Sequence, residues 1–170
     1  MNILKEKGEN VKEIITIILG ALPISEVRGA IPYALKMNMS LSKAFILSVF
    51  GNFIPVIPTL LLLEPVSNYL RRYSIGDKFF TWLFARTRRH SDAIEKYEAL
   101  GLAIFVGVPL PMTGAWSGCV AAFIFGLKFW RSVIAITAGI IIAAIIVSFV
   151  AVGAINLGAI TGILTKSVSF

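Results

Sequence analysis

The sequence has few of the residues that build most catalytic sites. It contains one cysteine, Cys119, and one histidine, His90, among 170 residues. A single cysteine excludes a disulfide within the chain, and together with one histidine it supplies too few ligands for a zinc site. The apolar segments hold no serine–histidine pair and no paired carboxylates. We therefore expect no enzymatic activity, no bound metal and no cofactor.

Charged residues are also scarce. They make up 15% of the chain, apolar residues make up 57%, and the mean hydropathy is +0.85. A soluble domain of this length needs more polar residues to cover its surface. The composition therefore predicts an all-α, multi-pass integral protein of the cell membrane, with residues 1–170 forming a single domain.

The net charge of +7 indicates lipid and not nucleic acid as the partner. Cations at the edges of apolar segments bind lipid phosphates at the membrane interface. The basic residues in such places are Lys36, Lys43, Arg71, Arg72, Arg86, Arg88, Arg89, Lys128 and Arg131.

Two uncharged segments are long enough to span the membrane as helices. Residues 44–63 form the first, and residues 132–165 contain the second, for which 132–157 already suffices. A helix of about 20 residues crosses a hydrocarbon core of about 30 Å. We expect Pro55 and Pro58 to kink the first span.

Two further apolar segments are interrupted near their middle. PISEVRG divides residues 14–35, and PLPMTGAWSG divides residues 99–127. The arm before each break has about ten residues, so as a helix it reaches roughly half-way through the hydrocarbon. Irregular backbone at that depth must be buried in protein or line a watery cavity. We expect two re-entrant hairpins with non-helical tips at 23–29 and 109–118 that approach each other; the alternative is a kinked full span.

The halves of the chain resemble each other. The order of parts repeats, with a short arm, a proline-containing break, a short arm, a basic pair and a long span. This order predicts two inverted repeats, residues 13–64 and 99–160, which is a pattern typical of transporters. Between them, residues 65–98 interleave aromatic with basic residues, which predicts interfacial helices; a cytosolic binding module is the alternative. A shift of 88 residues aligns Leu22 with Leu110, Pro23 with Pro111, Ser25 with Thr113, Ala34 with Ala122, Lys43 with Arg131 and Gly51 with Gly139.

The first break carries Glu26 and Arg28, two charges that would be costly in bare hydrocarbon. In extended backbone, residues two apart point to the same side, so both should face a cavity. Burial favours the neutral carboxyl and a neighbouring guanidinium favours the ionised one. The pair is therefore predicted to be a proton switch, with Arg28 binding an anionic headgroup when Glu26 is neutral. The alternative is an ion pair that holds the hairpin closed.

The second break carries no charge. It offers hydroxyl groups, free backbone amides and the Trp116 indole, which is either a cavity wall or an interfacial anchor. The residues predicted to bind substrate and couple protons are Glu26, Arg28, Ser25, Pro23, Thr113, Trp116, Pro109 and Pro111.

In PISEVRGAIP and PLPMTGAWSG the sequence resembles the small multidrug export protein family, over most of residues 15–150. More distantly it is similar to the DedA/VTT superfamily, in which re-entrant hairpins accompany membrane spans and some members move lipids such as undecaprenyl phosphate between leaflets. That resemblance implies a functional Pro-x-x-Glu motif in the first hairpin, which residues 23–26 match. The second hairpin of the superfamily contains an arginine, whereas this chain has none between Lys96 and Lys128.

Three functional hypotheses follow. The first is a transporter or lipid flippase that moves an anionic amphiphile, such as a polyprenyl or phospholipid phosphate, with proton coupling; a small multidrug exporter is its variant. The second is a membrane scaffold that transports nothing, and the third is an intramembrane enzyme. Because two full spans enclose little volume, a homodimer is a reasonable hypothesis.

Overall fold

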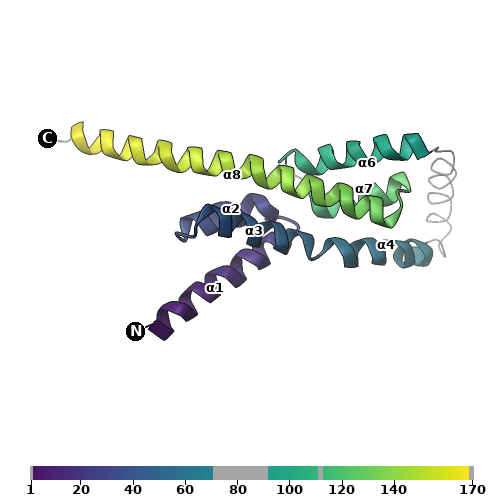
Figure 1. Cartoon of the computed structure of the whole chain (residues 1–170), viewed down its shortest axis with the longest axis horizontal. Coiled ribbons are helices and arrows are strands. Elements are labelled where there is room, and N and C mark those ends of the chain that lie inside the picture. The colour runs from purple at the N-terminus through teal and green to yellow at the C-terminus, as the bar shows by residue number, and fades with distance from the viewer. Residues whose placement is uncertain (1, 71–91, 111–112, 169–170) are drawn as a thin grey trace.

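The computed structural model describes residues 2–70, 92–110 and 113–168, and every regular element in these ranges is an α-helix. Figure 1 shows α8 as the long helix, and all the other helices except α1 contact it. The helices are α1 (Asn2–Ala21), α2 (Glu26–Lys36), α3 (Leu41–Phe53), α4 (Val56–Leu70), α6 (Asp92–Gly107), α7 (Ala115–Phe125) and α8 (Phe129–Val168).

Two stretches are long and apolar enough to cross a membrane. Leu41–Leu63 runs through α3 and α4, and Phe129–Leu157 lies within α8. Both contain the segments predicted from the sequence. The helical path is interrupted between α3 and α4 at Pro55, as predicted. Pro58 lies in the first turn of α4 and cannot bond to the carbonyl of Ile54, four residues earlier, so it adjoins the same interruption.

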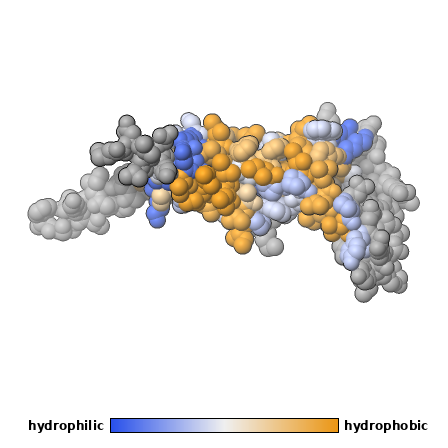
Figure 2. Space-filling view, turned by 90° about the horizontal axis from the view of Figure 1, so that it is seen from below, coloured by the Kyte–Doolittle hydropathy of each residue, from blue (hydrophilic) through white to orange (hydrophobic). Residues whose placement is uncertain are grey.

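The molecular surface is apolar over its middle part. Figure 2 shows hydrophobic side chains gathered between hydrophilic patches at two ends. Large exposed apolar patches of this kind are rare on soluble monomers and suit a hydrocarbon environment. The surface and the two apolar stretches together indicate a membrane protein. Exposed apolar side chains include Ile46, Phe50, Leu62, Ile134, Phe149 and Val150.

The chain turns back after α1 and again after α6, and the helices on either side of each turn contact each other (Figure 1). The non-helical breaks are shorter than predicted. The first covers residues 22–25, and the second ends where α7 begins at Ala115. Helical hydrogen bonding resumes at once after Pro23, because the Glu26 amide donates to the Leu22 carbonyl at 3.1 Å. The expected non-helical stretch is therefore wrong for residues 26–29 and 115–118.

Local structure recurs at the spacing of 88 residues seen in the sequence. α1 packs against α3 at Gly51, and α6 packs against α8 at Gly139, where a Cβ would lie 2.6 Å from that of Val106. Left-handed backbone follows both short helices, with φ 61° at Asn38 after α2 and φ 69° at Gly126 after α7. Each pair is separated by the same 88 residues.

The interior forms where α2, α3, α6 and α7 pack against α8. Small residues let these helices approach closely, as is common between membrane helices. Most of the predicted interfacial segment, with His90, lies outside the described residues, as does Pro111. The buried core includes Val27, Ala30, Ile31, Ala44, Leu102, Val106, Ala122, Ile136, Ile140 and Ala144.

Candidate functional site

The two breaks meet in space, as the sequence predicted. The Arg28 Nη2 donates a hydrogen bond to the Thr113 Oγ1 at 3.1 Å. The Trp116 indole Nε1 donates to the backbone carbonyl of Ala21 at 3.1 Å. Both bonds join the first tip, at the α1–α2 turn, to the second tip, at the α6–α7 turn, so the tips form one site.

Glu26 lies at the N-terminus of α7. Its side chain is 5% exposed, and a Cβ added to Gly114 would overlap its carboxylate. The backbone amides of Trp116 and Ala115 act on this carboxylate as hydrogen-bond donors. The first turn of a helix presents free N–H groups and a partial positive charge, so it attracts an anion. A carboxylate from the first tip therefore caps the helix that follows the second tip.

The backbone of Glu26 is strained. Its φ is 49°, in the left-handed region that residues other than glycine rarely adopt. Such conformations cost about 1–3 kcal/mol and persist only where surrounding contacts impose them. The contacts at the start of α7 place the Glu26 carboxylate there in spite of this cost.

Thr113 holds the second tip in shape. Its hydroxyl donates to the Val108 carbonyl at 2.6 Å, and it accepts from the Leu110 amide at 3.2 Å. Its second lone pair accepts the bond from Arg28. Thr113 thus closes the turn and presents an oxygen to the guanidinium at the same time.

Arg28 lies between two cavities. The first cavity, of about 450 Å³, is lined by residues of both tips. The second, of about 870 Å³, is lined partly by α8. The buried Nε of Arg28 has no hydrogen-bond partner among the described residues, so one donor of this cation is free. The first cavity is lined by Pro23, Ile24, Glu26, Arg28, Thr113, Gly114, Trp116 and Ser117.

The second cavity combines cations with an apolar wall. Arg28 and Lys36 are its basic residues, and Pro109 and side chains of α8 also line it. A binding site of this kind suits a molecule with an anionic group and a hydrocarbon part. Its α8 wall consists of Ile146, Val147, Val150, Ala151, Ala154 and Ile155.

Most of the predicted site residues line these two cavities. Ser25 lines neither; it precedes α2, and its carbonyl accepts from the Gly29 amide at 2.9 Å. Pro111 lies outside the described residues. The structure brings together Pro23, Glu26, Arg28, Thr113 and Trp116 at the first cavity and places Pro109 at the second.

The extended backbone expected between Glu26 and Arg28 is wrong, because α2 begins at Glu26. Both side chains nevertheless line the first cavity, and the charge of Arg28 acts on the Glu26 carboxylate. Although both residues are described, no salt bridge joins them. Each reaches the second tip instead, Glu26 at Gly114 and Arg28 at Thr113.

The sequence reasoning missed Gly114, which contacts Glu26, and two buried polar residues of α3. Gly114 is the most important, and the shift of 88 residues could have found it, because that shift aligns Gly114 with Glu26. Ser48 and Asn52 are also buried in α3, and the Ser48 hydroxyl and Asn52 carbonyl oxygens have no partner within the described ranges. The amide of Asn52 within an apolar segment was a visible signal of a buried polar position.

The chain was compared with known proteins. A model of the family described as "Putative small multi-drug export protein" matches residues 26–146, which is well over half of the chain. The match starts at Glu26 and includes Arg28, Thr113, Gly114 and Trp116. None of the curated proteins or solved structures compared with the chain matches it. The chain therefore belongs to the small multi-drug export protein family.

Proposed function

We propose that this protein is a multi-pass cell-membrane transporter that moves an anionic amphiphile together with protons. One observation carries the proposal. A buried carboxylate, Glu26, occupies an anion-binding helix N-terminus beside an arginine, in a cavity of about 450 Å³. A substrate phosphate would require the same amides and the same guanidinium.

Glu26 and the substrate phosphate compete for these donors, and this competition couples proton binding to substrate binding. When Glu26 takes up a proton, it loses its charge and its hold on the α7 amides weakens. The headgroup phosphate then binds the amides of Ala115 and Trp116 together with Arg28. When Glu26 loses its proton, the carboxylate returns to α7 and displaces the headgroup.

The hydrocarbon part of the substrate would lie in the second cavity. Arg28 borders both cavities, so a headgroup held there can leave its chain against the apolar wall of α8. This arrangement suits a polyprenyl or phospholipid phosphate. Lys36 adds a second cation along the same cavity.

Inverted repeats with re-entrant hairpins are part of the proposal. The matching positions of Gly51 and Gly139, and of Asn38 and Gly126, support two equivalent halves. The helices α2 and α7 have 11 residues each, which is roughly half the length needed to span the hydrocarbon. A homodimer would enlarge the enclosed path.

Drug export is the second candidate, because the family description names it. A lipophilic drug would bind the α8 wall without needing the α7 amides. We propose transport and not catalysis, because the first cavity offers one carboxylate with neither histidine nor cysteine.

Reconstitution into liposomes tests the proposal. A fluorescent lipid phosphate in one leaflet should move to the other when a pH gradient is imposed, and Glu26→Gln should abolish the dependence on that gradient. A neutral fluorescent lipid serves as the control cargo. Accumulation of a lipophilic cationic dye without lipid movement would favour drug export, and movement of neither would indicate a scaffold.

A further inference from the structure

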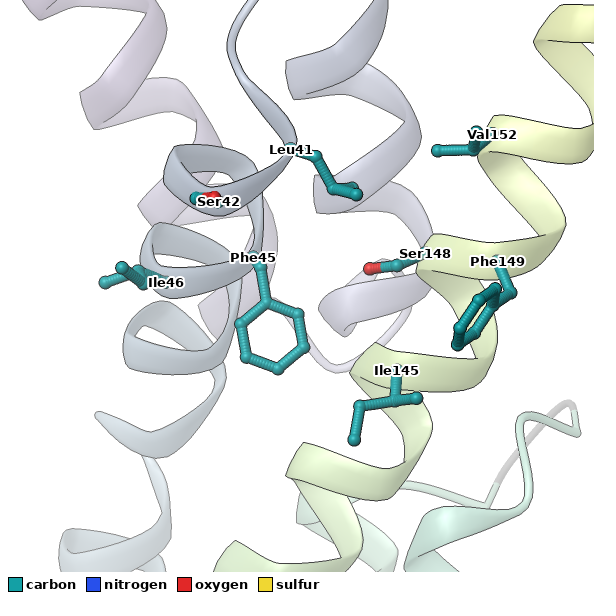
Figure 3. Close-up of a pocket in the computed structure, with 8 residues that line it drawn as sticks. All are labelled: Leu41, Ser42, Phe45, Ile46, Ile145, Ser148, Phe149 and Val152. Carbon is teal, nitrogen blue, oxygen red and sulfur yellow. The ribbon is translucent and has the colours of Figure 1, made fainter.

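An apolar cavity of about 440 Å³ lies between α3 and α8. Figure 3 shows side chains of the two helices facing each other across it. None of its lining residues borders either cavity at the tips, and none is charged. The lining residues are Leu41, Ser42, Phe45, Ile46, Ile145, Ser148, Phe149 and Val152.

Ser148 is the unusual residue of this cavity. It is 8% exposed, and its Oγ has no hydrogen-bond partner among the described residues. Thr137, also in α8, bonds to its own helix, because its Oγ1 donates to the Val133 carbonyl at 2.7 Å. The Ser148 hydroxyl instead points toward the space between the helices (Figure 3). A buried donor without a partner is costly, so a ligand acceptor would stabilise it.

We propose that this cavity binds an acyl chain of a membrane glycerolipid, whose ester carbonyl accepts a hydrogen bond from Ser148. The uncharged walls match a hydrocarbon chain, and the volume lies in the range of about 300–1,000 Å³ that is common for ligand sites. Its walls belong to the two candidate membrane spans. At its rim Ile46 and Phe149 are 63% and 78% exposed, so the cavity adjoins the lipid-facing surface.

The position of the cavity suits an ester group. Leu41 is the first residue of one candidate span, and the polar residues Asn38 and Ser40 precede it, so the cavity lies near the end of that span. Lipid esters lie in this interfacial region of a bilayer.

The test compares two phosphatidylcholines with equal chains, one ester-linked and one ether-linked. Binding to the delipidated full chain is measured by native mass spectrometry in a mild detergent. Because an ether lacks the carbonyl, the wild type should bind the ester lipid about 3–10-fold more tightly. Ser148→Ala should remove this preference, and Ser148→Leu should fill the cavity and weaken the binding of both lipids. Thr137→Ala, which removes a hydroxyl of α8 outside the cavity, should leave the preference intact.

Equal affinity of the wild type for the two lipids would overturn the proposal without requiring any variant to fold. Unchanged lipid binding by a folded Ser148→Leu protein would overturn it as well. Loss of a dimer in Ser148→Leu, with lipid binding unaffected, would assign the cavity to a second copy. The result does not depend on transport, since no residue of the tips takes part.

Discussion

Glu26 and Gly114 lie in direct contact, and the Glu26 carboxylate fills the space that a side chain at position 114 would need. These two positions are 88 residues apart, the spacing at which the two proposed repeats align. One half supplies the charge, and the other supplies the gap and the helix N-terminus that receive it. The contact links the two tips through a group that a proton can neutralise.

Gly114→Ala should displace the carboxylate from the start of α7. A folded variant should lose most proton-driven lipid movement, because its Glu26 no longer competes with substrate for the α7 amides. Gly153→Ala is the matched control, since a Cβ at Gly153 meets nothing within 4 Å. Transport in liposomes measures both, and full activity of Gly114→Ala would contradict the coupling mechanism.

Glu26→Gln should fold and lose its response to a pH gradient. Glutamine is nearly isosteric with the protonated carboxyl, so the tips can still pack, but it cannot release a proton. Glu26→Ala should in addition lose about 0.5–2 kcal/mol of stability, because α7 loses its cap. Thermal unfolding in detergent and transport at two pH gradients separate the effects. A folded Glu26→Gln protein that still follows the gradient would show that the proton is carried elsewhere.

Arg28→Lys should weaken substrate binding more than it weakens the fold. Lysine keeps the charge but lacks the planar group that binds phosphate through two hydrogen bonds. We expect the half-saturating lipid phosphate concentration to rise about tenfold, on the order of one lost charged hydrogen bond. Exchanging Glu26 and Arg28 should not restore function, because each has its own partner on the second tip. Rescue by that exchange would support a simple ion pair.

Gly139→Ala should destabilise the crossing of α6 and α8. The added Cβ would lie 2.6 Å from the Val106 Cβ and 2.8 Å from the Ala103 carbonyl oxygen, so the helices must separate. Overpacking of this kind costs about 1–3 kcal/mol. Gly153→Ala on the same helix should have little effect, and thermal unfolding of the two variants makes the comparison. Equal stability of both would contradict the close approach.

Trp116→Phe should lower the stability of the protein less than the loss of a charged hydrogen bond would. It removes the hydrogen bond from the indole to the Ala21 carbonyl but keeps an aromatic ring in the cavity wall. A loss of about 0.5–1.5 kcal/mol is expected, as for one neutral hydrogen bond. Retention of transport in this variant would assign Trp116 to joining the tips, whereas loss of transport at unchanged stability would assign it to substrate binding.

The sequence by itself determined the helical segments and where they are interrupted. Long uncharged runs can bury their backbone polar groups only as helices, and proline removes the donor that a helix needs at its interior. The interruptions at Pro23 and Pro55 follow from these local rules. The spacing of 88 residues also aligned the two tips, and it aligned Gly51 with Gly139, each of which lies at a close helix contact.

Only the tertiary structure decided which groups meet. Helical hydrogen bonding resumes at Glu26, and the partners of Glu26 and Arg28 both lie on the other tip. The bond from Arg28 to Thr113 joins residues 85 apart, and Ser148 faces α3 from α8. Local sequence fixes backbone hydrogen bonds between near neighbours. The partner of a buried side chain depends on how distant helices pack, because their packing sets which donor and acceptor lie within reach.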